Sequence, residues 1–238
     1  MVSFIVPAYN EELELPQTLA AIRAASEKSG ETYEIIVADD GSTDSTATLA
    51  TLAGARVVKI QRRQIAAARN AGAREARGDI LFFVDADTHI AAGHVTGALN
   101  ILRSGCAGGG ARMVVDGDIS RWMRAGTVLF CAVYFAANLG AGAFLFTTRA
   151  NFERIGGFDE QYFAGEEIYF TKALKKIGRF CLLREPVVTS GRKLRMHSPR
   201  NIFWQCIQIT LSGGRAIRSR EKLDLWYDGK REEIASEV

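Results

Sequence analysis

The stretch ILFFV at residues 80–84, followed by Asp85-Ala86-Asp87, decides the fold of this chain. An uninterrupted apolar run of this length is typical of a strand that is buried on both faces of a parallel sheet. Two carboxylates follow where the strand leaves the sheet, and ligands of open α/β sheets bind outside the carboxyl ends of strands. The two carboxylates repel each other unless a cation lies between them, and oxygen ligands of this kind suit Mg²⁺ or Mn²⁺ held against substrate phosphates.

The segments before this strand predict an alternation of strands and helices. Strands are expected at residues 2–7, 34–38, 56–60 and 80–84. Helices are expected from Leu15, with Pro16 in the first turn, from Thr43 or Asp44 to residue 53, and over residues 65–77 with an end at Gly78. Strands that alternate with helices predict an α/β fold whose mostly parallel sheet is flanked by helices.

The second half has a looser pattern. A helix is expected over residues 93–103 and a glycine-rich strand over residues 108–115. Residues 125–148 carry no charge and are long enough to span a bilayer, but Asn138, Gly140 and Gly142 interrupt them. We therefore favour a helix followed by a strand at residues 142–146. The domain expected at residues 1–198 has a nucleotide-binding half (1–88) and an acceptor half (89–198), and residues 199–238 form a helical segment with a charged tail.

Composition excludes several functional classes. The chain has 238 residues, of which 47% are hydrophobic, so one domain with a large core is expected. A net charge of only +3, without a basic stripe, argues against nucleic acid as a partner. Four scattered cysteines (Cys106, Cys131, Cys181 and Cys206) and no secretory leader indicate a cytoplasmic protein with reduced thiols.

Three polar loops follow predicted strands, at residues 7–12 (PAYNEE), 39–44 (DDGSTD) and 85–87 (DAD). Together with residues 68–72 (ARNAG), 156–160 (GGFDE) and 165–167 (GEE), these loops resemble, in order, the motifs of family 2 inverting glycosyltransferases, which have the GT-A fold. The Gln-x-x-Arg-Trp motif of the processive members is missing. The resemblance therefore implies a stand-alone, non-processive bacterial type that transfers one sugar, as a hexosyltransferase does, from a nucleotide-diphosphate sugar.

The resemblance also assigns the donor site. Residues expected to bind the nucleotide are Pro7, Ala8, Tyr9, Glu11, Asp39, Asp40, Arg69, Asp85 and Ala86. Either Asp39 or Asp40 would accept the imide N–H of uracil, so that UDP is the favoured carrier. Arg69 would meet the base or the pyrophosphate.

A divalent cation, Mg²⁺ or Mn²⁺, is implied by the DXD motif. Its ligands would be Asp85 and Asp87. In the family the second Asp is usually the direct ligand and the first often contacts the ribose or a metal-bound water, but the sequence alone does not separate the two roles. His197 is a further candidate ligand, whereas His89 and His94 are interpreted as structural residues.

The catalytic base is assigned to the pair Glu166-Glu167. Inversion requires deprotonation of the acceptor hydroxyl, and a carboxylate serves if burial or a neighbouring acid raises its pKa. The family usually has Glu-Asp here, so Glu167 aligns with the base but is one methylene longer, and Glu166 remains an alternative. Gly157, Phe158 and Asp159 are expected at the acceptor mouth, and Arg192 or Lys193 near the diphosphate.

Two other functions remain open. A sugar nucleotidyltransferase would need a glycine-rich basic loop in place of residues 7–12. A non-catalytic module that only binds a nucleotide-sugar would be expected if Glu167 cannot act as the base. Residues 201–217 are rich in apolar side chains, and Arg215, Arg218 and Arg220 lie at or just after their end. This mixture predicts either peripheral contact with the membrane, as a lipid-linked acceptor would need, or contact with the domain or a homodimer partner.

Overall fold

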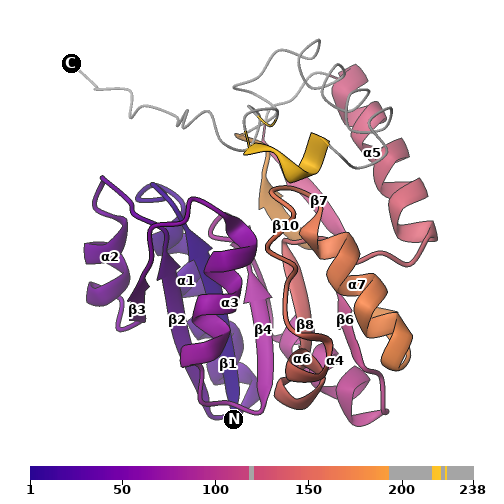
Figure 1. The fold of residues 1–238 in the computed structure, drawn as a ribbon, viewed down its shortest axis with the longest axis horizontal. Coiled ribbons are helices and arrows are strands. Elements are labelled where there is room, and N and C mark those ends of the chain that lie inside the picture. Colours follow the sequence, from indigo (N-terminus) through magenta and orange to yellow (C-terminus); the bar gives the residue numbers. More distant parts are fainter. Residues whose placement is uncertain (118–120, 193–215, 221–222, 224–238) are drawn as a thin grey trace.

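The computed structural model describes residues 1–117, 121–192, 216–220 and 223, and Figure 1 shows their arrangement. Its main sheet has seven strands in the order β3-β2-β1-β4-β8-β6-β9, and a second sheet has the order β5-β10-β7. Helices cover both faces of the main sheet, which confirms the predicted α/β class.

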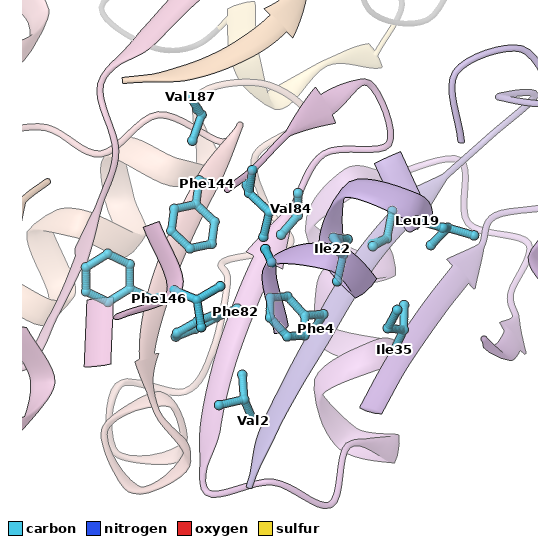
Figure 2. Close-up of a cluster of buried hydrophobic side chains, with 14 of the residues drawn as sticks. Val2, Phe4, Leu19, Ile22, Ile35, Phe82, Val84, Phe144, Phe146 and Val187 are labelled. Atoms are coloured by element: carbon cyan, nitrogen blue, oxygen red, sulfur yellow. The ribbon is translucent and has the colours of Figure 1, made fainter. Parts of the chain in front are cut away.

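The first half is a parallel, doubly wound unit, as predicted. Its strands are β1 (Val2–Ala8), β2 (Tyr33–Asp39), β3 (Arg56–Lys59) and β4 (Ile80–Val84), which pair in parallel. Its helices are α1 (Leu15–Ser29), α2 (Thr46–Leu52) and α3 (Ile65–Glu75). Alternate side chains of the strands enter separate cores, so that Phe4 and Phe82 pack with α1 (Figure 2) while Ile5 and Phe83 pack on the face that α3 covers.

The second half adds antiparallel strands and the small sheet. β8 (Phe144–Thr148) runs antiparallel to β4 and to β6 (Gly108–Gly110), and β9 (Phe180–Leu182) pairs in parallel with β6. The small sheet contains β5 (Thr88–His89), β7 (Met113–Asp116) and β10 (Val187–Ser190). The remaining elements are α4 (Ala92–Arg103), α5 (Arg121–Ala136), α6 (Arg149–Ile155), α7 (Glu166–Ile177) and the 3₁₀ helix η1 (Ala216–Arg218).

Three predicted boundaries were wrong. The single strand expected at residues 108–115 is in fact two strands, which belong to different sheets. The chain runs beside β8 as far as the bond from Ala111 N to the Phe144 carbonyl, and then pairs with β10 as strand β7. Helix α3 ends at Glu75, two residues before the expected end. The Arg149 guanidinium donates hydrogen bonds to the carbonyls of Ala73, Ala76 and Gly78 at this end. Helix α2 begins only at Thr46, since the residues before it bond to the loop that follows β1.

The uncharged region at residues 125–148 forms most of α5, a connecting loop and β8, as we favoured. Within the described part of the chain, no helix combines the length and apolar character that a membrane crossing requires. Helix α5 projects from the edge of the domain at the upper right of Figure 1.

Candidate active site

The candidate site lies at the carboxyl ends of β1, β2 and β4. Because β1 has β2 on one side and β4 on the other, the strand order reverses beside β1. A reversal of this kind opens a crevice at the carboxyl edge of a parallel sheet, which is where such sheets bind ligands. The three polar loops of the sequence meet at this edge, and hydrogen bonds join the first two, for example from Asn10 N to Ser42 Oγ at 2.9 Å.

A buried arginine connects the strand end with helix α7. The Arg69 side chain is 1% exposed, and its Nη2 donates to Asp85 Oδ1 at 2.7 Å while its Nη1 donates to Glu166 Oε1 at 2.5 Å. Nη2 also lies 3.3 Å from the carbonyl of Gly142. The three residues come from α3, β4 and α7, so that one guanidinium fixes the relative positions of three elements.

The second carboxylate of α7, Glu167, stands beside this cluster, close to the charges of Arg69 and Glu166. Burial raises its pKa, and the neighbouring charge of Glu166 raises it further, to about 8, although Arg69 works in the opposite direction. Burial also raises the pKa of Glu166, against the attraction of Arg69. The phenol of Tyr134 on α5 contacts Glu167, and burial and the charges of Glu167 and Glu166 raise the pKa of this phenol.

Asp39 and Asp40 have different surroundings. Asp40 Oδ1 accepts from the backbone N–H groups of Arg62 and Arg63 at 2.6 and 2.8 Å, and its Oδ2 accepts from Gln64 N at 2.6 Å. Its carboxylate therefore satisfies the free N–H groups just before α3. Asp39 accepts one backbone bond, from Ser42 N to Oδ1 at 3.0 Å. Asp39 is therefore the better candidate to bind the base of a nucleotide.

Replacing Asp40 by asparagine is expected to lower the free energy of unfolding by about 1–3 kcal/mol, because the amide NH₂ would face backbone donors in a buried place. Asp39→Asn is the matched variant, since its amide oxygen still accepts from Ser42. Urea unfolding compares the two. Equal losses of stability in both variants would contradict the capping role of Asp40.

The other predicted donor residues lie along the loop after β1. Pro7 and Ala8 are the buried last residues of β1, and Ala86 is also buried. The Tyr9 ring is covered by the Arg63 guanidinium, whose carbon lies 3.2 Å from the ring centroid. A flat base that stacks on Tyr9 would therefore have to displace Arg63 or use the other face of the ring.

The predicted residues Glu11 and Arg192 form an ion pair. Arg192 is 2% exposed, and its Nη2 donates to Glu11 Oε2 at 2.7 Å. Burial by itself would lower the pKa of Arg192, but Glu11, Asp87 and Glu14 raise it. The Nε of Arg192 is buried without a partner among the described residues, so that the ion pair with Glu11 leaves one donor of this guanidinium unsatisfied.

The two carboxylates of the DXD motif make different contacts. Asp85 faces Arg69, whereas Asp87 Oδ1 accepts from Thr189 Oγ1 at 3.2 Å and lines a cavity of about 200 Å³ with Glu14, His89 and Asp116. Among the described residues, no three His, Cys, Asp or Glu side chains gather as a metal group. The predicted ligand His197 lies outside the described residues.

The residues present nevertheless fit a divalent cation. Both carboxylates are hard oxygen donors, and Mg²⁺ is usually held by one or two protein carboxylates with substrate phosphates and water. A Cβ at Gly142 would lie 3.4 Å from Asp85 Oδ2 and 2.7 Å from Arg69 Nη2. Glycine at this position therefore keeps space open in front of the second oxygen of Asp85.

Two predicted contacts are corrected by the structure. Arg69 does not face an open donor site, because its guanidinium is buried between Asp85 and Glu166. Phe158 is a core residue, because its ring is 2% exposed, stacks on Phe170 and meets Phe83 edge to face. Neither side chain is available for the substrate contact that was expected of it.

The glycine-rich loop before α7 has a structural explanation. Asn70 receives the Phe158 N–H and donates to the Phe158 carbonyl, so that α3 holds this loop. Gly157 has φ +75°, and a Cβ there would lie 2.7 Å from Asn70 Oδ1. Asp159 is exposed and lines an open cavity of about 570 Å³ with Gly157, so that its acceptor role stays a prediction.

The two histidines interpreted as structural lie apart from the carboxylate cluster. His94 accepts from Ala91 N at 2.9 Å through Nδ1 and contacts the Pro186 carbonyl through Nε2. His89 pairs with Val188 between β5 and β10 and lines the cavity beside Asp87.

Sequence reasoning missed Tyr134 and Gly142. Both lie in the uncharged region that was considered only as a helix and strand or as a membrane span. The available signals were the phenol of Tyr134 in the uncharged part of this helix and a glycine shortly before a buried strand.

Comparison with known proteins agrees with this geometry. The model of the family described as "Glycosyl transferase family 2" matches residues 3–171. The undecaprenyl-phosphate 4-deoxy-4-formamido-L-arabinose transferase of Pseudomonas paraeruginosa is 39% identical over 94 residues, which are 37% of this chain and 28% of that relative. The matched region thus spans little more than a quarter of the relative's length.

Solved structures have the same fold. Residues 1–349 of TarS from S. aureus, in complex with UDP-GlcNAc, align with a TM-score of 0.64 and 20% identity over 80% of this chain and 58% of that chain. The mannosyltransferase PcManGT from Pyrobaculum calidifontis, in complex with GDP-Man and Mn²⁺, aligns with a TM-score of 0.64 and 21% identity over 97% of this chain and 65% of that chain. Since the family model covers residues 3–171, the chain belongs to glycosyl transferase family 2 and has the GT-A fold.

Proposed function

We propose that this protein transfers one sugar from a nucleotide-diphosphate sugar, with UDP as the favoured carrier, to an acceptor hydroxyl with inversion. The observation that carries the proposal is Glu167, a carboxyl at the start of α7 whose pKa is raised to about 8. Glu166 is already bound to Arg69, so that Glu167 is the better base of the two.

In the proposed reaction, Glu167 accepts the proton of the acceptor hydroxyl as its oxygen bonds to the anomeric carbon. The bond between this carbon and the donor diphosphate breaks on the opposite side, and the nucleoside diphosphate leaves with the electron pair. An α-linked donor therefore gives a β-linked product. The charge of Glu166 raises the pKa of Glu167, whereas Arg69, which is bound to Glu166, limits this increase.

Asp85 and Asp87 would hold the divalent cation. When bound, the cation neutralises negative charge that builds up on the departing diphosphate. Arg192, with its buried unpartnered Nε, would add a fixed positive charge on the same side of the site. Asp39 would accept the imide N–H of uracil.

The acceptor is proposed to be lipid-linked, with the protein in peripheral contact with the membrane. Support comes from the relatives named as undecaprenyl-phosphate 4-deoxy-4-formamido-L-arabinose transferases, which match more than a third of this chain. A nucleotide-sugar donor is supported by the structural relatives solved with UDP-GlcNAc and GDP-Man. Homodimer formation stays open.

A thermal-shift screen of UDP, GDP, CDP and TDP, each with and without Mn²⁺, tests the donor site. A nucleotide at a hundredfold excess over its Kd stabilises the fold by about 2.7 kcal/mol. We expect the largest shift with UDP and Mn²⁺, and loss of the Mn²⁺-dependent part in Asp87→Ala. Asp79→Ala, which removes an exposed carboxylate at the far end of β4, is the control and should respond as the wild type does. No shift with any nucleotide, or an unchanged shift in Asp87→Ala, would refute the assignment.

A further inference from the structure

Helix α5 presents an unusual number of exposed apolar side chains. Trp122, Val128, Leu129, Phe130 and Val133 are each between 58% and 68% exposed, and we call these five residues the α5 face. They make up half of the large hydrophobic side chains that are exposed in the described part of the chain. A concentration of this kind on one element marks an interaction surface.

The α5 face shares one residue, Val128, with a groove that has a rim of positive charge. A cavity of about 640 Å³ lies between α5 and β7, and its apolar wall includes Val114, Val128 and Phe135. Arg112, Arg124 and Arg184 also line it, whereas its lining contains no carboxylate. Helix α5 itself has no acidic residue over its whole length.

We propose that the α5 face docks onto an anionic lipid bilayer, with its apolar side chains between the lipid tails and the three arginines at the phosphates. Interfacial helices combine tryptophan, phenylalanine and leucine with arginine in this way. A single helix of 16 residues is about 24 Å long and cannot cross the hydrocarbon region. A protein partner would need acidic groups to match the arginines, whereas anionic headgroups supply that charge at every position of the surface.

Docking at this face would bring the bilayer to the catalytic carboxylates. Tyr134, on the same helix, donates to the Gly140 carbonyl at 2.9 Å and contacts Glu167. Phe130 of the α5 face lies one turn before Tyr134, and the two ring centroids are 5.7 Å apart, so that the lipid-facing side chains would adjoin the residue that contacts the proposed base. This consequence rests on the proposed function, since a lipid-linked acceptor would be presented beside Glu167, but lipid binding itself requires no turnover.

Co-sedimentation of the full chain with vesicles tests the proposal. Wild type is expected to bind vesicles of phosphatidylglycerol and phosphatidylcholine and to be released by high salt, with weak binding to phosphatidylcholine alone. Each basic residue at a membrane surface contributes enough that Arg124→Gln should lower the partition coefficient about fivefold. The double variant Leu129→Asp and Val133→Asp should lower it by more than about tenfold, because two apolar groups are lost and two charges gained.

Leu52→Asp is the matched control, because Leu52 is 79% exposed on α2 at another part of the surface. It should bind vesicles as the wild type does. Circular dichroism and the UDP–Mn²⁺ thermal shift show whether each variant is folded and retains its donor site. Loss of vesicle binding with an intact nucleotide shift would separate the docking surface from the proposed activity.

Tryptophan quenching by brominated lipids identifies the inserted segment. The chain has three tryptophans, Trp122, Trp204 and Trp226. We expect quenching in the wild type and its loss in Trp122→Phe, which should still bind vesicles. Quenching that persists in Trp122→Phe would assign insertion to residues 201–217 or to the tail, and would overturn the proposal. A wild-type dimer that the double variant dissociates, without vesicle binding, would overturn it in favour of a second copy of the chain.

Discussion

Glu167→Gln is expected to lower kcat by about 10²–10⁴-fold, the range by which a general base accelerates proton transfer. The amide cannot accept the proton of an acceptor hydroxyl, whereas it preserves the size and hydrogen-bonding capacity of the side chain. Donor binding should persist, because Glu167 is assigned no contact with the nucleotide. Calorimetric titration with UDP and Mn²⁺ measures binding, and release of UDP in the presence of acceptor measures turnover.

Glu27→Gln, at an exposed position on α1, is the control for this substitution. It should retain both donor binding and turnover. Unchanged turnover in Glu167→Gln would remove the base assignment, and it would also indicate a different acceptor chemistry. A phosphate oxygen of a polyprenyl phosphate is already ionised at neutral pH and needs no base, whereas a hydroxyl does. The variant therefore distinguishes the two kinds of lipid-linked acceptor.

The raised pKa of Glu167 predicts two effects of pH that test its assignment as the base. Because the base acts when deprotonated, kcat should rise with pH up to about 8 and then level off, and this rise should vanish in Glu167→Gln. The pKa of this group is higher in the folded state than the ordinary value of 4.5, so between these values the folded state binds more protons. Wild-type stability should fall across this range relative to Glu167→Gln, as thermal unfolding at several pH values would measure.

Arg69→Met is expected to lower the free energy of unfolding by about 3–5 kcal/mol, because it leaves buried carboxylates without their counter-charge. Arg69 bonds to both Asp85 and Glu166 while only 1% of its side chain is exposed. Methionine fills a similar volume, so the loss is electrostatic rather than one of packing. Urea unfolding measures the change.

Arg56→Met provides the comparison. Arg56 pairs with Glu34 and Glu75, but its side chain is 34% exposed, and exposed pairs contribute only about 0–1 kcal/mol. Adding Glu166→Gln to Arg69→Met should restore part of the lost stability, because one uncompensated charge is removed. Equal effects of Arg56→Met and Arg69→Met, or no recovery in the double variant, would show that the buried cluster does not depend on charge pairing.

Much of the fold was predictable because the relevant signals are local. The apolar run before Asp85 and the alternation of strands with helices are properties of short segments, and β1 to β4 formed where they were expected. The predicted ends of helices were wrong where groups that are distant in the sequence form hydrogen bonds with the backbone. Arg149 donates to the carbonyls of Ala76 and Gly78 just after α3, and side chains of the loop after β1 accept from the N–H groups before α2.

The candidate site divides in the same way. Its residue types and their order along the chain were visible in the sequence, and they sufficed to identify the family. The partner of each side chain was not visible, because Arg69, Asp85 and Glu166 are joined only when α3, β4 and α7 pack together. The same holds for Asp40, whose role depends on three N–H groups that lie more than twenty residues away.

Hydrophobic patterns and the order of motifs along the chain were enough to predict the parallel half of the sheet, the edge at which its polar loops meet and the family to which the chain belongs. Only the tertiary contacts show that Asp40 caps a helix while Asp39 is left for a ligand, and that Phe158 is a core residue. They also show that Glu166 is paired with Arg69 while Glu167 has a raised pKa. The physical reason is that patterns of hydrophobicity act over a few neighbouring residues. Charge pairing and desolvation depend on distances in space, which no short segment of the sequence contains.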